Sequence, residues 1–101
     1  MEWMMTRLPS DEEVAELARL YSLAADPTRL KLLLSLLEGE KCVCELSASA
    51  GTSVSAASHQ LRLLRSGSLV SPRREGRHIF YKLADDHVRA FLELSLEHAR
   101  E

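Results

Sequence analysis

The 101-residue sequence contains few of the residues that interrupt or cross-link a chain: four glycines, three prolines and two cysteines. Low glycine and proline content with an apolar fraction of 46% is typical of a folded globular protein and argues against disorder. No apolar run approaches the roughly 18 residues that a membrane-spanning helix needs. At this length we expect a single domain over residues 1–101, small enough to gain stability from a second subunit.

The sequence also lacks a secretory signal, because residues 1–13 contain one arginine, several acids and no long apolar core. We therefore expect a cytoplasmic protein that does not associate with a membrane. Its two cysteines, Cys42 and Cys44, are separated by a single residue, which is too close for an ordinary structural disulfide. A reducing compartment would keep both as thiols. Met1 to Met5, with Trp3, form an arm that is expected to be loose or to pack across a partner.

An overall excess of positive charge, common in nucleic-acid-binding proteins, is absent, since the formal net charge is −2. The charge is, however, unevenly distributed. Residues 54–84 contain six basic residues and one acidic residue, a local charge of +5, which leaves −7 on the remainder. A basic face on an acidic body can bind DNA in one orientation and limits non-specific binding elsewhere.

Residues 45–65 contain two helical patterns separated by a tight turn. Gly51 supplies a turn in which positive φ costs little, and Thr52 or Ser53 can cap the second helix. In the second helix an apolar stripe recurs every three or four residues and is expected to face the core: Val54, Ala57, Leu61 and Leu64. Two short helices joined in this way predict a helix-turn-helix.

The opposite face of the second helix carries short or hydrogen-bonding side chains, which let a helix approach base edges in a major groove. The candidate DNA-contacting residues of this segment are Ser53, Ser55, Ala56, Ser58, His59, Gln60 and Arg62. An ordinary helical hairpin with a solvated, serine-rich face is the alternative interpretation.

The residues after this helix predict a β-hairpin. Leu69 and Val70 begin an extended run, residues 72–76 form a basic turn, and residues 78–83 form a second β-rich run. A basic hairpin directly after a recognition helix is the wing of a winged helix, whose arginines reach phosphates or the minor groove. The candidate residues here are Arg73, Arg74 and Arg77. A solvated hairpin kept soluble by these arginines is the alternative.

Two further helices are expected before this motif. Ser10 and Glu13 form a capping box in front of the first. Its apolar face contains Val14, Leu17, Ala18 and Tyr21. Asp26 caps the second helix, with Pro27 at its first position, and this helix is apolar over most of its girth and ends at Gly39. It should be the buried core helix of a fold that is mainly α with a β-hairpin, a winged helix-turn-helix.

The last segment predicts a helix that begins near Asp85. Its apolar residues are Val88, Phe91, Leu92, Leu94, Leu96 and Ala99. They cover more surface than one domain buries, so part of this helix is expected to pack against another chain. His87 and His98 are eleven residues apart, roughly 16 Å along the axis, and one ion cannot bridge them within one helix.

Two copies of this helix packed antiparallel about a twofold axis bring Asp85 and His87 of one chain beside His98 and Glu101 of the other. Asp85 must then lie at the non-helical entry, as an N-cap position allows. Two imidazoles and two carboxylates suit tetrahedral Zn²⁺ or a similar divalent ion. Each residue alone is explained as well by a solvated helix end, but the spacing of all four favours an intersubunit metal site.

Cys42 and Cys44 are a second candidate metal site. In an extended segment the two thiols lie on the same side and can chelate a soft ion, and a nearby helix N-terminus favours the thiolate. Two small buried apolar side chains are an equally good interpretation of the spacing. A closed site would need additional donors, because two sulfurs do not complete a coordination shell.

Four segments in this order carry a family resemblance: ADPTRLKLL at residues 25–33, CVCEL at 42–46, SVSAASHQLRLLR at 53–65 and GRHIFYKL at 76–83. From about Glu12 to Glu101 the chain resembles the ArsR/SmtB family of metal-responsive repressors. The pattern formed by Asp85, His87, His98 and Glu101 matches members that sense zinc through the last helix. The Cys-Val-Cys segment matches the thiolate motif of members that detect soft metals.

This resemblance implies a transcriptional repressor and not an enzyme. It implies a homodimer, joined through its N- and C-terminal helices, that binds double-stranded operator DNA without metal. Zn(II) or a similar divalent ion at the last helix would act as effector and release the DNA. The alternative is a regulator in which Cys42 and Cys44 respond to a soft metal or to oxidation. A metalloenzyme is less compatible with a small helical chain, because it needs an open coordination position in a sizeable cleft.

Overall fold

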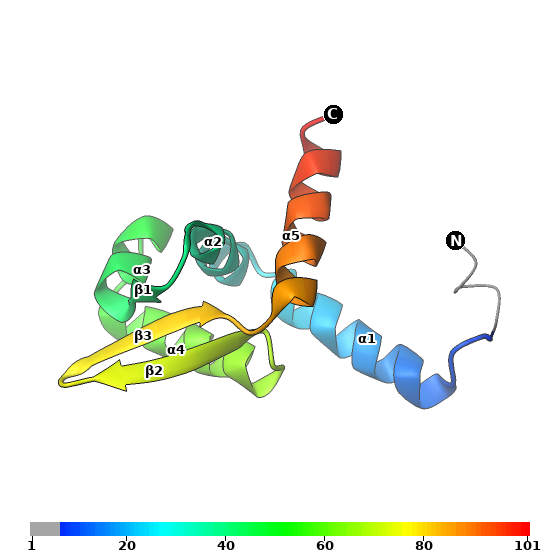
Figure 1. Cartoon of the computed structure of the whole chain (residues 1–101), viewed down its shortest axis with the longest axis horizontal. Coiled ribbons are helices and arrows are strands. Elements are labelled where there is room, and N and C mark those ends of the chain that lie inside the picture. Colours follow the sequence, from blue (N-terminus) through cyan, green and yellow to red (C-terminus); the bar gives the residue numbers. More distant parts are fainter. Residues whose placement is uncertain (1–6) are drawn as a thin grey trace.

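The computed structural model describes residues 7–101, which form helices around a small antiparallel sheet (Figure 1). In chain order the elements are α1 (Asp11–Ala24), α2 (Pro27–Ser35), the 3-10 turn η2 (Leu36–Glu38), β1 (Lys41–Cys42), α3 (Val43–Ala50), α4 (Val54–Ser66), β2 (Val70–Glu75), β3 (His78–Leu83) and α5 (Asp86–Ala99). The expectation for the arm at residues 1–5 lies outside the described residues. Among residues 7–101, none of the helices has both the length and the apolar character needed to cross a bilayer.

Four helices begin where a side chain accepts a hydrogen bond from a backbone N–H of the first turn. Ser10 makes the predicted capping box with Glu13 at the start of α1. Asp26 caps α2, Ser53 caps α4 and Asp85 caps α5, each by accepting a backbone N–H bond of 3.0 Å. The predicted starts of these helices are therefore confirmed, and of the two candidate caps for α4 it is Ser53 that is used.

The core lies where α2, α3 and α4 pack together against the sheet. Its largest fully buried side chains are all leucines: Leu32, Leu33, Leu36, Leu46, Leu61, Leu64, Leu69 and Leu92. Three of these belong to α2 and η2, so the prediction of a buried second helix is confirmed. In the predicted stripe of α4, Ala57, Leu61 and Leu64 are fully buried, but Val54 is 49% exposed. The prediction for Val54 is wrong because this residue is the first of α4 and precedes the turns that pack on the core.

The predicted hairpin is formed by β2 and β3, which pair along six residues each. The predicted turn over residues 72–76 is wrong in extent, because residues 72–75 belong to β2 and the turn is confined to Gly76, at φ 62°, and Arg77. Pro72 is tolerated in this strand because β2 lies at the edge of the sheet. A third strand, β1, joins the other side of β3, so that the strand order is β1-β3-β2. Only two pairs connect β1 to β3: Lys41 with Tyr81, and Cys42 with Phe80. The tip of the hairpin therefore extends beyond the three-stranded part of the sheet.

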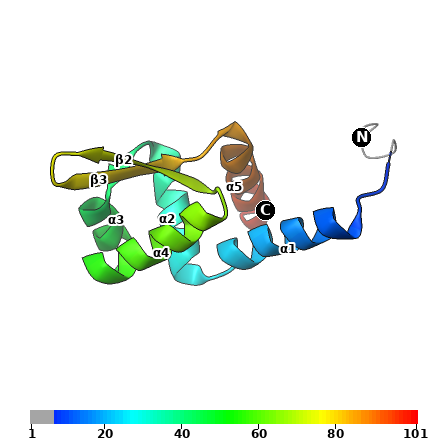
Figure 2. The same cartoon turned by 90° about the horizontal axis from the view of Figure 1, so that it is seen from below.

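The short turn between α3 and α4 has Gly51 at φ 67°, a conformation that favours glycine. With the hairpin following α4, the chain has the predicted winged helix-turn-helix architecture (Figure 2). The hairpin extends toward one end of the molecule and α1 toward the other, while α5 rises beside the end of α1 (Figure 1). The apolar face of α1 is left uncovered, since Val14, Leu17 and Tyr21 are each about half exposed.

Candidate DNA-binding surface and metal-ligating residues

The recognition helix α4 presents small polar side chains at its N-terminal end, next to the Gly51 turn. Of the predicted DNA-contacting residues, four are exposed and three are partly buried: Ser53, Ser55, His59 and Arg62 in the first group, Ala56, Ser58 and Gln60 in the second. Short side chains at the start of a helix permit close approach to the base edges of a major groove. The exposed members are thus placed as a DNA-contacting helix requires.

Among the three partly buried candidates, Gln60 is the one whose side chain is hydrogen-bonded to another helix. Its Oε1 atom accepts a hydrogen bond of 3.0 Å from Nη1 of Arg29, a residue on α2. The same arginine donates through Nε to the carbonyl oxygen of Leu23 at 2.7 Å. Arg29 was not among the residues singled out from the sequence, although it stands in the segment ADPTRLKLL that carries the family resemblance.

The three arginines of the wing have different surroundings. Arg74 and Arg77 are exposed near the tip of the hairpin. Arg73 instead donates through Nη2 and Nε to Glu40, at 2.6 and 3.1 Å, and through Nη1 to Glu75 at 2.7 Å. Its guanidinium also lies 4.8 Å from the ring centroid of Phe80. These contacts tie Arg73 to Glu40 and Glu75, so that it is less free to meet a phosphate than its neighbours, and its predicted role as a DNA contact stays a prediction.

The Arg73 cluster changes the acidity of its members. The hydrogen bond from Arg73 lowers the pKa of Glu40 below its ordinary value, and the positive charges of Arg73 and Lys82 act in the same direction. The hydrogen bonds that Arg73 donates to Glu40 and then to Glu75 raise its own pKa in return. The pairs are therefore charged at neutral pH, and Glu40, which the sequence did not single out, is the first cause of the raised pKa of Arg73.

The four predicted ligands of the last helix form two pairs at its opposite ends. At the N-terminal end, Nδ1 of His87 lies 3.9 Å from Oδ1 of Asp85. At the C-terminal end, Nδ1 of His98 lies 3.9 Å from Oε1 of Glu101. All four side chains are largely exposed, with His87 completely so. Within residues 7–101 no group of three or more His, Cys, Asp or Glu side chains comes together as a metal site, so one chain brings only pairs of donors together.

The two cysteines lie beside the DNA-binding surface and are both free thiols. Cys42 is half-buried, ends β1 and precedes α3, while Cys44 is exposed in the first turn of α3. They line a cavity of about 160 Å³ together with Val54 and Ser58 of α4 and with Arg77 and His78 of the wing. Any group bound to the thiols would therefore contact both the recognition helix and the hairpin.

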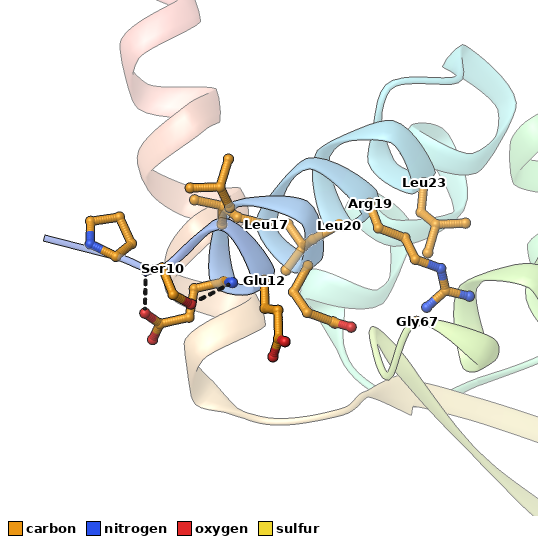
Figure 3. A pocket seen from close by; sticks show the side chains of 11 residues that line it. Ser10, Glu12, Leu17, Arg19, Leu20, Leu23 and Gly67 are labelled. Carbon is orange, nitrogen blue, oxygen red and sulfur yellow. Dashed lines mark hydrogen bonds between the residues drawn. The ribbon is translucent and has the colours of Figure 1, made fainter.

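Two surface grooves follow the helices that are expected to meet a partner. One, of about 390 Å³, lies between α1, α2 and α5 and is lined mainly by apolar side chains, among them Tyr21, Leu34 and Leu96. The other, of about 550 Å³, runs along α1 to the turn after α4 (Figure 3). Figure 3 shows Leu17 and Leu20 along this groove and Leu23 beside Gly67 at its end.

Comparison with known proteins identifies the family. Residues 26–71, from α2 to the start of β2, match the model of the arsR family of bacterial regulatory proteins. A transcriptional repressor SmtB homolog from a Synechocystis species is 44% identical over 90 residues, which are 89% of this chain and 68% of that protein. The chain belongs to the ArsR family. Its members are DNA-binding regulators of transcription and not enzymes, as the sequence predicted.

Two further proteins resemble this ArsR-family chain, one in sequence and one in structure. A cadmium resistance transcriptional regulatory protein CadC homolog from Staphylococcus aureus is 38% identical over 85% of this chain and 72% of its own length. A homodimeric winged helix-turn-helix DNA-binding domain from Mycobacterium bovis superposes with a TM-score of 0.82. It is 33% identical, and the match covers 92% of this chain and 89% of that domain. The predicted fold class is thereby confirmed.

Proposed function

We propose that this ArsR-family chain is a metal-responsive transcriptional repressor. It acts as a homodimer that binds operator DNA in the absence of metal and is released when Zn²⁺ or a similar divalent ion binds between the two copies of α5. The observation that carries the proposal is the placement of four ligand-type side chains as two pairs on one exposed stripe of α5.

This stripe is also apolar between the two pairs. Leu94 is seven residues after His87 and four before His98, so all three side chains project in similar directions from the helix. Leu94 is 67% exposed in the single chain. A second α5, packed antiparallel across this stripe, covers Leu94 and brings the first donor pair of one chain to the second pair of the other. Leu17 and Tyr21, of the uncovered face of α1, line a cavity together with His87 and so add apolar surface beside the first donor pair.

The donor pairs fit a tetrahedral ion in type and spacing. Two ligands about 2 Å from a tetrahedral Zn²⁺ lie roughly 3.3 Å from each other. The nitrogen and oxygen atoms in each pair are 3.9 Å apart, so a small side-chain rotation brings both into the first coordination shell. Each complete site then contains two imidazoles and two carboxylates, and a symmetric dimer contains two sites.

DNA and metal oppose each other through the geometry of the dimer. Bound to DNA, the two copies of α4 must lie about 34 Å apart to enter successive major grooves. An ion that ties two α5 helices together favours one arrangement of the subunits. If that arrangement differs from the one on DNA, metal weakens DNA binding and DNA weakens metal binding by the same factor.

Mixed dimers test whether each site is shared between chains. We expect the His87→Ala and His98→Ala homodimers to bind DNA but to lose zinc-induced release. A dimer with one chain of each kind, purified through two affinity tags, contains one site that lacks both histidines and one that is complete. This mixed dimer should bind one tight Zn²⁺ and recover release.

Glu97→Ala, on an exposed part of the same helix, is the matched control and should leave zinc binding at two ions per dimer. If the mixed dimer binds no Zn²⁺ tightly, or if either histidine homodimer still releases DNA normally, the site does not lie between two copies of α5.

The two thiols support a second candidate effector. Cys42 and Cys44 share a cavity with Ser58 of α4 and Arg77 of the wing, so a soft ion or an oxidised sulfur there would disturb the DNA-binding surface directly. Cys42→Ser/Cys44→Ser should then abolish release by cadmium or peroxide and leave release by zinc unchanged. An unaltered cadmium and peroxide response would assign the two cysteines to packing alone.

A further inference from the structure

Three residues, Arg19 and Leu23 of α1 and Arg29 of α2, connect these helices to α4 and the turn after it. Leu23 lies so close to the turn after α4 that a Cβ on Gly67 would be 2.2 Å from its Cδ1 atom. Arg19 donates to the hydroxyl of Ser66 at 3.5 Å. The third contact, made by Arg29, is the most specific of them and links α1, α2 and α4.

Arg29 uses one guanidinium to hold two helices. Its Nε donates to the carbonyl of Leu23, which belongs to the last turn of α1 and has no partner within that helix. Its Nη1 donates to Oε1 of Gln60 on α4. The residue itself is fixed at the start of α2, where its backbone N–H bonds to the capping carboxylate of Asp26. These contacts are partly buried, where charge-assisted hydrogen bonds are stronger than at the surface.

The bond to Arg29 restricts what the amide of Gln60 can do. Guanidinium groups only donate hydrogen bonds, so the carbonyl of the amide must face Arg29, and this bond occupies one of its two acceptor positions. A glutamine that recognises adenine uses its carbonyl and its NH₂ together, one on N6 and the other on N7. Gln60 is partly buried and its carbonyl is turned toward Arg29, an orientation that does not favour this bidentate contact.

We infer that Arg29 is a positioning residue that fixes the recognition helix to α1, and that Gln60 serves this link and does not recognise a base. The inference rests on the proposed operator binding. Because α1 carries the uncovered apolar face, its position relative to α4 sets where the two recognition helices of a dimer stand. Loosening the link misplaces α4 as a whole, so DNA affinity falls while the pattern of preferred bases is kept.

The test compares Arg29→Met, Gln60→Met and the double variant on a duplex that the wild-type protein selects from random sequences. Each single variant should bind on the order of tenfold more weakly, as expected for removal of one hydrogen bond to a charged group. The double variant should bind no more weakly than Arg29→Met, because Arg29→Met already removes the contact that Gln60→Met removes. Base preferences, measured by substituting each position of the duplex, should stay as in the wild type.

Two control variants on α4 separate positioning from direct contact. Arg62→Met removes an exposed charge and should lower the salt dependence of binding, whereas Arg29→Met should not. His59→Ala removes an exposed side chain of α4 and should change the preference at individual base pairs. Gln60→Glu keeps an acceptor opposite Arg29 and should retain the wild-type base preferences. Thermal unfolding and dimer mass are measured for every variant, and Gln60→Met provides the comparison should Arg29→Met fail to fold.

Independent, additive effects of Arg29→Met and Gln60→Met would overturn the inference. So would a loss of preference at one base pair per half-site in Gln60→Met or Gln60→Glu. Failure of the proposed function looks different: the wild-type protein itself would then select no sequence from the random pool.

Discussion

Arg73, on the second strand of the sheet, donates to both carboxylate oxygens of Glu40, a residue 33 positions earlier in the loop before β1. The same guanidinium covers the ring of Phe80 on β3. One arginine of the wing thus ties the hairpin to the body of the protein, whereas Arg74 and Arg77 are exposed, as their predicted role in DNA binding requires.

The three arginines should therefore differ in their effect on DNA binding. Removing a single arginine–phosphate interaction lowers the slope of log K against log salt by about 0.9 for duplex DNA. We expect Arg74→Gln and Arg77→Gln each to lower the slope by about this amount, and Arg73→Gln to change it much less. Binding measured at several salt concentrations gives the slopes. A full unit of change in Arg73→Gln alone would show that DNA displaces Glu40 from this arginine.

The lowered pKa of Glu40 predicts a dependence of stability on pH. A carboxylate whose pKa is lower in the folded protein stabilises the fold above its unfolded pKa, and this contribution is lost as pH falls through the folded value. Urea unfolding should show wild-type protein to be more stable than Glu40→Gln at pH 7. The difference should shrink as the pH drops below the ordinary glutamate value of 4.5.

Glu97→Gln, on the exposed face of α5, is the control for the loss of a carboxylate and should show no such convergence. A difference between wild type and Glu40→Gln that stays constant from pH 7 to pH 3 would mean that the ion pair with Arg73 is not what the mutation removes.

The contact between Leu23 and Gly67 predicts a compensating pair of mutations. Gly67→Ala places a methyl group where Leu23 now packs, and overpacking of this kind costs about 1–3 kcal/mol. Shortening the opposite side chain in Leu23→Ala/Gly67→Ala should recover part of that loss, although Leu23→Ala alone is destabilising. Thermal or urea unfolding of the three variants forms a double-mutant cycle. An additive cycle would place the two residues out of contact.

Asp85 has two roles that one substitution separates. It caps α5 by accepting the N–H bond of Val88, and it is one of the proposed metal ligands. Asparagine caps helices about as well as aspartate but lacks the charge, so Asp85→Asn should keep the stability and weaken zinc binding. Asp85→Ala should lose about 1 kcal/mol of stability as well. Equal zinc affinity in Asp85→Asn and wild type, measured by calorimetry, would remove Asp85 from the ligand set.

Local sequence signals predicted much of the fold. Capping residues at Ser10, Asp26 and Asp85 mark the starts of three helices, and the β-rich run from His78 to Leu83 coincides with β3. These elements could be predicted because each signal lies within a few residues of the structure it specifies. The apolar periodicity of α4 gave one wrong prediction of burial, at Val54, because the helix begins there before it reaches the core.

The partners of individual polar side chains could not be predicted in the same way. Arg29 meets Gln60 across 31 residues, and Arg73 meets Glu40 across 33, so neither pair leaves a pattern in the local sequence. Charge alone favoured Arg73 as a DNA contact, and only the tertiary structure shows that its donors are used elsewhere. For the four donors of α5 the spacing is visible in the sequence. A single chain, however, brings them together only as two pairs, and their convergence on one ion requires a second chain.

The short first strand determines which part of the wing is held by the rest of the sheet. Because β1 pairs only with Phe80 and Tyr81, the third strand supports the hairpin at its middle, and the outer part of the hairpin projects beyond it. A bend in the outer part, which ends in Gly76, would not break any backbone pairing between β1 and β3. We expect a positively charged tip held in this way to adapt to grooves of different width, so that differences in DNA shape beside the binding site are tolerated without a shift of α4.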